Sequence, residues 1–260
     1  MNHTIQTTSP FCFAAPSYAN SVPLVQLIPD IAPGSRVIVD LPARLLPMLQ
    51  DHTADAALIP VAALFGNPGL DMIEGVGICA EKVVRSVLLK CNRPLAQVRT
   101  VKLDVASRTS NNLAFILLRN HWKLEARPIY PNDPSEADAE VVIGDRALCE
   151  PRAPHGDYDL ATAWNQMTGL PFVFAAWAYR HNHPSPGDLA KVIHAAKRSG
   201  VAALPKLALQ VALRLGLSEA VCMNYFTTCI YYDLGDRERQ GMQLFKQLIT
   251  EMPPLFPKES

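Results

Sequence analysis

The sequence lacks an excess of charge of either sign and lacks any long apolar run. Its 260 residues include 24 Lys and Arg against 24 Asp and Glu, which gives a net charge of +0 and a pI near 7.0. Proteins that bind the phosphate backbone of nucleic acids normally carry a basic patch, so this class is disfavoured. Pro, Gly or a charged residue interrupts each apolar stretch before it reaches the roughly 18 residues of a membrane span. We therefore expect a small-molecule partner, with no nucleic acid and no membrane.

Paired cysteines and the common catalytic motifs are missing as well. The six cysteines are scattered, without a C-x-x-C pair or a Cys/His cluster at the spacing of zinc ligands, and His181 and His183 are too isolated for a metal site. No G-x-S-x-G, P-loop, G-x-G-x-x-G or H-E-x-x-H motif is present, which disfavours a hydrolase, an NTPase, a dinucleotide enzyme and a zinc protease. We expect buried cysteines in a reducing compartment, and no metal.

The start of the chain gives no sign of export. No Lys or Arg precedes Phe11, and the apolar stretch at this point is short, so the basic region and the longer apolar stretch of a secretory signal are absent. We expect a cytoplasmic protein with a short loose N-terminus.

The sequence does have enough apolar residues, 49% of the chain, to form packed cores, and its 22 prolines indicate many turns between short elements. Residues 36–40 and 86–89 are predicted to be buried strands, and residues 41–50 a short helix that Pro47 breaks or kinks. After Pro186 the pattern turns helical in four segments, at residues 188–197, 206–215, 218–225 and 237–250. Strands that alternate with helices favour an α/β fold.

Two stretches of the chain resemble each other. Residues 54–60 (Ala-Asp-Ala-Ala-Leu-Ile-Pro) and 137–144 (Ala-Asp-Ala-Glu-Val-Val-Ile-Gly) each combine a turn, an apolar strand and a tight loop. A polar strand-to-helix junction precedes each stretch, at residues 17–21 and 107–111. Two copies of one plan favour two similar lobes, although Ala-Asp-Ala before a buried strand also recurs by chance.

The junction at residues 107–111 gathers hydroxyl and amide groups where a helix is predicted to begin. The first N–H groups of a helix lie at the positive end of its dipole and can hold a carboxylate or a phosphate. The candidate ligand contacts, or else helix caps, are Ser107, Thr109, Ser110 and Asn111. Arg108 either pairs with a substrate carboxylate or folds back onto an acid such as Asp104.

Other candidate residues follow predicted strands. Asn20, which closely follows Tyr18, either faces a cleft at the carboxyl end of a strand or is a turn residue. Gly144 ends the second apolar strand and lets a ligand approach the backbone closely. Asp145 is a helix cap, a latch between lobes or a catalytic base. The Gly-Pro turn and aromatic run at residues 168–177 are interpreted as core packing.

Several segments match, in order, the pattern of one known family. They are Tyr18-Ala19-Asn20-Ser21-Val22-Pro23-Leu24, residues 54–60, Ser86-Val87-Leu88-Leu89, Ser107-Arg108-Thr109-Ser110, residues 143–148, Trp164 with residues 168–175, and residues 230–241 with Tyr232-x-Leu234-Gly235. Together they resemble the MqnA group of chorismate dehydratases of the futalosine route to menaquinone, which is close to the MqnD group. The resemblance covers nearly the whole chain.

The resemblance implies a two-lobe α/β fold of the type II periplasmic-binding-protein class, with a cleft between the lobes and a helical C-terminal layer. We expect the first lobe to comprise residues 1–99 and 181–260, and the second to be the inserted residues 100–180. The implied activity is that of a hydro-lyase, which removes water from chorismate to give 3-[(1-carboxyvinyl)oxy]benzoate. No metal or organic cofactor is expected.

The resemblance also implies roles for particular residues. Asn20 and Ser86 match the family's catalytic positions. The Ser-Arg-Thr-Ser junction is implied to hold a substrate carboxylate through hydroxyl and backbone N–H groups. The expected substrate contacts are Tyr18, Ser107, Arg108, Thr109, Ser110, Asn111, Gly144 and Asp145.

Two places depart from the family pattern. Ala19 stands where the family has Leu, and Val84-Arg85 precedes Ser86 where the family has small residues. Arg85 either points to solvent or fills the pocket and changes the ligand. The rival functions are a non-catalytic carboxylate-binding protein of the same fold and an MqnD-type enzyme acting on cyclic dehypoxanthinyl futalosine, although the Ser-Arg-Thr-Ser motif favours the dehydratase.

Overall fold

The computed structural model describes residue 5 and residues 10–256, and the chain divides into two units. Unit 1 comprises the residues up to Cys79 together with Val173–Gly235, and unit 2 comprises Ala80–Phe172 together with the residues from Asp236 onward. The N-terminus that was expected to be loose falls mostly outside the described residues. Each unit is built around a sheet of its own.

The sheet of unit 1 has six strands. They are β1 (Cys12–Pro16), β2 (Arg36–Asp40), β3 (Ala56–Pro60), β4 (Leu70–Ala80), β10 (Phe172–Arg180) and β11 (Tyr231–Leu234). Their order across the sheet is β11-β4-β10-β3-β1-β2. β1 pairs in parallel with β2 and β3, whereas β10 runs antiparallel to β3. Every residue of β1 and β3 is buried, as expected for strands that are covered on both faces.

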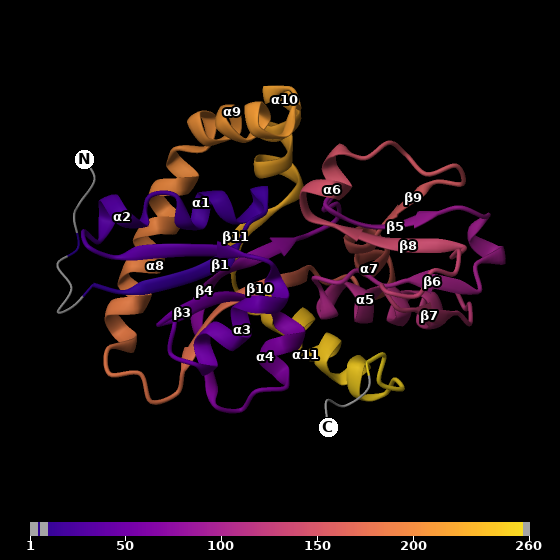
Figure 1. Ribbon diagram of the computed structural model, residues 1–260, viewed down its shortest axis with the longest axis horizontal. Helices are drawn as coiled ribbons and strands as arrows, with labels where there is room; N and C mark the ends of the chain where they lie inside the picture. The colour runs from indigo at the N-terminus through magenta and orange to yellow at the C-terminus, as the bar shows by residue number, and fades with distance from the viewer. Residues whose placement is uncertain (1–4, 6–9, 257–260) are drawn as a thin grey trace. The chain divides into compact units, whose positions relative to one another are not determined.

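The helices of unit 1 lie on both sides of this sheet. They are the 3₁₀ turn η1 (Ala19–Ser21), α1 (Val22–Val25), α2 (Ile28–Ile31), α3 (Pro42–Gln50), α4 (Val61–Phe65), α8 (Pro186–Ala202), α9 (Leu204–Leu215), α10 (Glu219–Asn224) and the π-helical turn η3 (Tyr225–Cys229). Figure 1 shows α3 and α4 on one side of the sheet and α1 and α2 on the other. Helix α8 packs against α1, and a Cβ atom at Gly200 would lie 1.7 Å from the carbonyl oxygen of Pro23.

Alternate residues of a strand point to opposite faces of the sheet, and the two faces of unit 1 carry different side chains. On one face the small residues Ala14 and Ala57 pack against Leu45 of α3. On the other face the rings of Phe13 and Trp177 meet edge-on, with their centroids 5.9 Å apart. The alanines therefore leave room for α3 to lie close to the sheet.

The sheet of unit 2 has five strands. They are β5 (Val87–Cys91), β6 (Thr100–Lys102), β7 (Arg127–Ile129), β8 (Ala139–Ile143) and β9 (Asp157–Asp159). Their order is β7-β6-β8-β5-β9. β6 pairs in parallel with β7 and β8, and β5 runs antiparallel to β8 and β9.

The helices of unit 2 pack on this sheet and on each other. They are the 3₁₀ turn η2 (Leu95–Gln97), α5 (Arg108–Asn120), α6 (Gly144–Cys149), α7 (Leu160–Thr168) and α11 (Asp236–Thr250). Ala147 of α6 packs against Leu88 and Val142. Trp164 of α7 and Phe245 of α11 meet edge-on, and Phe172 contacts both rings. This cluster holds α11 in unit 2.

The division into units differs from the lobes expected from the sequence. Residues 80–99 were expected in the first lobe, but β5 pairs with β8 and β9 of unit 2. The second lobe was expected to reach residue 180, but β10 pairs with β3 of unit 1. The predicted C-terminal helices are present, with α8 to α10 in unit 1 and α11 in unit 2. Pairing between strands that are distant in sequence sets these boundaries.

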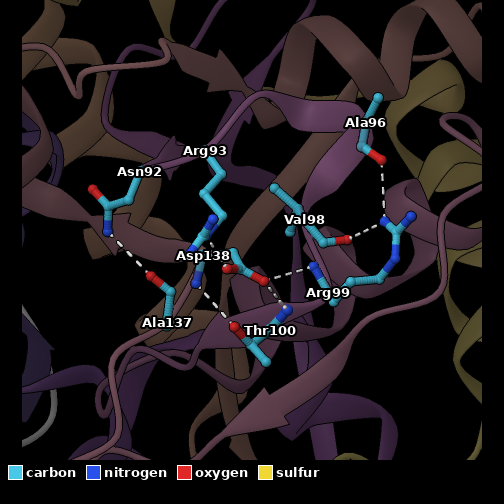
Figure 2. Close-up of polar contacts among 8 residues, drawn as sticks. All are labelled: Asn92, Arg93, Ala96, Val98, Arg99, Thr100, Ala137 and Asp138. Carbon is cyan, nitrogen blue, oxygen red and sulfur yellow. Dashed lines mark hydrogen bonds and ion pairs between the residues drawn. The ribbon is translucent and has the colours of Figure 1, made fainter.

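Both units repeat one strand plan. In unit 1 the order β10-β3-β1-β2 joins one antiparallel strand to three parallel ones, and the order β5-β8-β6-β7 in unit 2 does the same. The two similar stretches of sequence form β3 and β8. Asp55, before β3, accepts a 2.7 Å hydrogen bond from the N–H of Cys12, which begins β1. Asp138, before β8, accepts bonds of 2.9 and 3.0 Å from the N–H groups of Arg99 and Thr100, where β6 begins (Figure 2).

Two predicted elements differ in detail. Helix α3 continues through Pro47, because the burial of Leu45 and Leu49 stabilises the helix despite the missing N–H. β2 forms where a buried strand was predicted, but its side chains are exposed or half-buried because it is the outermost strand of the sheet.

Candidate active site

Predicted residues from several segments of unit 2 meet at one edge of its sheet. β6 and β8 are parallel, so their carboxyl ends, at Lys102 and Ile143, lie at the same edge. β5 runs antiparallel to β8 with Val87 opposite Ile143, which places Ser86 at this edge as well. The N–H of Gly144 donates a 2.8 Å hydrogen bond to the carbonyl oxygen of Ser86. The carboxyl ends of parallel strands are where open α/β sheets bind ligands.

Ser86 follows a tight turn and is almost completely buried, with 1% of its surface exposed. Its N–H donates a 2.7 Å hydrogen bond to the carbonyl oxygen of Val84. Arg85, between them, has a φ of +59°, in the left-handed region that few residues other than glycine adopt. The Arg85 side chain is exposed, which agrees with the solvent-facing alternative.

Helix α5 begins at the same edge with a cluster of buried hydroxyl groups. Ser107 caps the helix, because its Oγ accepts a 3.1 Å hydrogen bond from the N–H of Ser110. The Ser107 hydroxyl also lies 3.0 Å from the Ser110 Oγ. One of the two hydroxyl hydrogens forms this bond, and the hydrogen of the other hydroxyl remains available for a further acceptor. Together with Thr109, which is also buried, they surround the positive end of the α5 dipole, where a carboxylate is favoured.

Asn111 has a structural part in this turn. Its Oδ1 accepts a 3.0 Å hydrogen bond from the N–H of Asp104, and its Nδ2 donates a 2.8 Å bond to the carbonyl oxygen of Asp104. Asn111 has no exposed surface. Burial raises the pKa of the Asp104 carboxyl, and the hydrogen bond from the N–H of Ala106 offsets this only in part. Asn111 therefore holds the loop before α5, and its contact with a ligand stays a prediction.

Arg108, the first residue of α5, has an exposed side chain. Its guanidinium carbon lies 5.3 Å from the centre of the Phe256 ring, within the range of a cation–π contact. The sequence did not predict this contact with the C-terminal segment, and the pairing of Arg108 with a substrate carboxylate or an acid stays a prediction.

Gly144 and Asp145 begin helix α6 at the same edge. Gly144 has a φ of +62°, which a residue with a side chain adopts only at a cost. Asp145 lies in the first turn of α6, where an acidic side chain complements the helix dipole. The structure thus brings Gly144 next to Ser86 through the backbone and places Asp145 one residue further on.

In unit 1, the predicted residues Tyr18 and Asn20 follow the carboxyl end of β1. The hydroxyl of Ser21 lies 2.6 Å from the carbonyl oxygen of Pro16 and 2.8 Å from that of Tyr18, which fixes the turn. The Oδ1 atom of Asn20 is buried, and no described residue supplies it with a hydrogen bond. A buried polar atom of this kind calls for an explanation, and a ligand is one.

The sequence interpretation assigned no role to two residues that hold these turns. The Tyr232 hydroxyl donates a 3.1 Å hydrogen bond to the backbone carbonyl of Asn20. Tyr232 is buried, which raises the pKa of its hydroxyl well above the usual value and keeps it a donor. Asp159 caps α7 and also accepts hydrogen bonds from the turn before Ser86. The Tyr232-x-Leu234-Gly235 motif contains the first residue. The second, Asp159, was not singled out, because an Asp before a helix indicates only a cap.

The histidines and cysteines form no cluster of metal ligands in the part of the chain that the structure describes. His181 contacts Asp71, and His183 contacts Asp55. Five of the six cysteines are buried as predicted, but Cys149 is exposed. Burial, with a smaller effect of the nearby Asp157, raises the pKa of the Cys91 thiol to about 12.

None of the helices within residues 10–256 is long and apolar enough to cross a membrane.

The protein belongs to the class with a periplasmic-binding-protein fold. The alkanesulfonate-binding protein SsuA of Xanthomonas axonopodis pv. citri, bound to MOPS, is similar with a TM-score of 0.67 and 13% identity, over 97% of this chain and 96% of that one. The aliphatic sulphonate-binding protein SsuA of Escherichia coli gives a TM-score of 0.65 and 15% identity, over 94% and 93%. These similarities confirm the expected fold.

More particularly, the chain is a member of the menaquinone biosynthesis family, whose model matches residues 13–251. It is 30% identical to the chorismate dehydratase of Thermus thermophilus over 96% of this chain and 99% of that protein. It is also 36% identical to the chorismate dehydratase of Campylobacter jejuni, over 40% of this chain and 36% of that protein. The family expected from the sequence is thus confirmed.

Proposed function

We propose that this chain is a chorismate dehydratase. The reaction removes the ring hydroxyl of chorismate as water and gives 3-[(1-carboxyvinyl)oxy]benzoate, a step of menaquinone biosynthesis by the futalosine route. The observation that carries the proposal is the similarity to the Thermus thermophilus chorismate dehydratase, which extends over 96% of the chain and 99% of that protein. Membership of the menaquinone biosynthesis family supports it.

Chorismate has two carboxylates, so a site for it must hold negative charge without a strongly basic protein. The start of α5 suits this need, because helix N–H groups and the hydroxyls of Ser107, Thr109 and Ser110 gather at the positive end of the helix dipole. We assign one substrate carboxylate to these groups. Arg108 adds positive charge one position from the cap.

The chemical step breaks one C–H bond and one C–O bond of the ring. The electron pair of the C–H bond enters the ring, the C–O pair leaves with the hydroxyl, and the hydroxyl departs as water after taking up a proton. Asn20 and Ser86 are neutral, so we assign them the orientation of reacting groups and hydrogen bonds to developing charge. The substrate's own enolpyruvyl carboxylate serves as the base for the ring proton.

The reaction causes no net oxidation or reduction, and the new aromatic ring supplies driving force. It therefore needs no electron carrier, in line with the expectation of no organic cofactor. We place the reaction in the cytoplasm, which agrees with the buried thiols of Cys12 and Cys91. The proposed partner is a small dianion.

Incubation of the purified protein with chorismate, followed by chromatography and mass spectrometry, tests the proposal. We expect enzyme-dependent loss of one water and formation of the aromatic enol ether, absent from a control without protein. If chorismate raises the melting temperature but no product forms, the chain is a binding protein and the proposed activity is wrong.

A further inference from the structure

Asp159, at the end of β9, is the cap of helix α7 and joins that helix to the turn before Ser86. Its Oδ1 accepts a 3.0 Å hydrogen bond from the N–H of Thr162 and lies 3.3 Å from the Thr162 hydroxyl. Its Oδ2 accepts bonds of 3.0 Å from the N–H of Val84 and 2.7 Å from the N–H of Arg85. One carboxylate therefore binds donors from two segments that are distant in the sequence.

Capping accounts for only half of these bonds. A helix cap needs the hydrogen bond to Thr162, which lies three residues further on. The bonds to two consecutive N–H groups of the Val84-Arg85 turn serve a different purpose. They hold Arg85 at a φ of +59°, a conformation that a non-glycine residue adopts only when its surroundings impose it.

The turn held by Asp159 leads directly into Ser86. The Ser86 N–H bonds to the carbonyl of Val84, and the Ser86 carbonyl accepts the N–H of Gly144. A shift of the Val84-Arg85 turn would therefore move the Ser86 backbone at the edge of the sheet. Because Ser86 is nearly fully buried, its hydroxyl has few alternative positions.

We propose that Asp159 is a positioning residue for Ser86, fixing the left-handed turn that sets the place of the Ser86 hydroxyl. The inference rests on the proposed function for its catalytic consequence. Asp159 itself touches no reacting atom in this account.

The test compares Asp159→Ala with Asp138→Ala. An asparagine could keep its oxygen on the turn and give its NH₂ to the Thr162 hydroxyl, which also accepts, whereas alanine has no acceptor, so Asp159→Ala loses both the Thr162 bonds and the turn bonds. Asp138 is a matched control, because it also accepts two backbone N–H groups in unit 2 (Figure 2). It lies before β8, whereas Gly144 and Ser86 lie at the other end of that strand. We expect Asp159→Ala to lower kcat between about 10- and 100-fold with little change in KM, and Asp138→Ala to leave kcat near the wild-type value.

A second substitution separates positioning from a general loss of stability. Glycine adopts a positive φ without outside support, so Arg85→Gly in the Asp159→Ala background should recover kcat several-fold. Arg85→Gly alone should keep the wild-type kcat. If the double variant is no faster than Asp159→Ala, or if Asp138→Ala loses as much kcat, the positioning role is wrong.

Amide hydrogen exchange tests the same role without turnover. In Asp159→Ala, the N–H groups of Ser86 and Gly144 should exchange faster than in the wild type, whereas in Asp138→Ala they should not. A wild-type chain that makes no product overturns the proposed function, and the exchange rates then decide the positioning role by themselves. Unchanged exchange at Ser86 and Gly144 in Asp159→Ala would overturn it.

Discussion

At the residue scale, the polar side chains near α5 are of two kinds: some form hydrogen bonds with the backbone, and others keep a hydroxyl hydrogen that can be donated to a ligand. Asn111 uses both polar atoms of its side chain on the backbone of Asp104, whereas Ser107 and Ser110 share a single bond between two hydroxyls. The sequence predicted a polar helix start with caps or ligand contacts. It could not separate the two roles, because the bonds of Asn111 depend on how the loop before α5 folds back.

The Asp104 carboxyl gives a prediction about pH. Burial raises its pKa in the folded state above the ordinary value of 3.8, so the folded state favours the protonated carboxyl. The stability that the protonated carboxyl contributes is fully present below 3.8 and is lost as the pH rises through the folded pKa. Asp104→Asn keeps an oxygen for the Ala106 N–H and cannot ionise. Urea unfolding should show the variant gaining stability relative to the wild type as the pH rises from below 3.8 to neutral.

Asp138→Asn is the control, because the pKa of Asp138 is shifted in the opposite direction and the stability of this variant should change with pH in the opposite sense. Burial tends to raise the pKa of Asp138, but the N–H groups of Arg99 and Thr100, the Thr100 hydroxyl and the charge of Arg93 outweigh it and lower the pKa. The ionised form stabilises the fold above 3.8, and this contribution is lost as the pH falls through the lowered pKa. Relative to the wild type, Asp138→Asn should lose stability as the pH rises. Parallel curves for the two variants would contradict the assignment.

At the element scale, close packing of helices on sheets and on one another outweighs local sequence preference. Helix α3 continues through Pro47 because Leu45 and Leu49 are buried. Local patterns predicted β3, β8 and the helices α8 to α11, since each carries its apolar period within its own residues. They could not predict that β2 would be an exposed outer strand, because that depends on which strands become its neighbours.

The contact between α1 and α8 gives a second prediction. A Cβ atom at Gly200 would meet the carbonyl oxygen of Pro23 at 1.7 Å and its carbon at 2.6 Å, and both are backbone atoms that cannot rotate away. Gly200→Ala should lower the free energy of unfolding by about 2 kcal/mol or more, measured by urea unfolding.

Gly187 of the same helix is the matched control. A Cβ atom there meets nothing within 4 Å, so Gly187→Ala should be neutral or stabilising by about 0.5 kcal/mol. Equal losses of stability in the two variants would show that the approach of α8 to Pro23 is not as close as described.

At the scale of the whole molecule, two units carry the same strand plan and the same Asp before the repeated strand. The near-repeat in the sequence predicted this duplication, because both copies of the motif include the turn, the strand and its Asp. The sequence could not give the unit boundaries. These depend on the pairing of β5 with β8 and on the return of β10 to β3, and in both pairs the two strands are far apart along the chain.

The residues to which the family resemblance gives roles belong to both units. Asn20 follows the first strand of unit 1, and Ser86 and the α5 junction belong to unit 2, where the sequence had placed Ser86 with the first lobe. The family resemblance predicted these residues by motif. The motif also contained Tyr232, but the contacts of Tyr232 with Asn20 and of Asp159 with the turn before Ser86 became visible only in the folded chain.

The most direct test of the account is the initial rate of chorismate dehydration by the wild type, Ser86→Ala and Ser35→Ala, measured side by side. Ser35 is a buried serine of unit 1 whose Oγ accepts the N–H of Phe11, so it controls for the loss of a buried hydroxyl. We predict product from the wild type and from Ser35→Ala, and a rate lower by about 100-fold or more from Ser86→Ala, with chorismate still raising its melting temperature. Equal rates for wild type and Ser86→Ala, or no product from the wild type, would contradict the account.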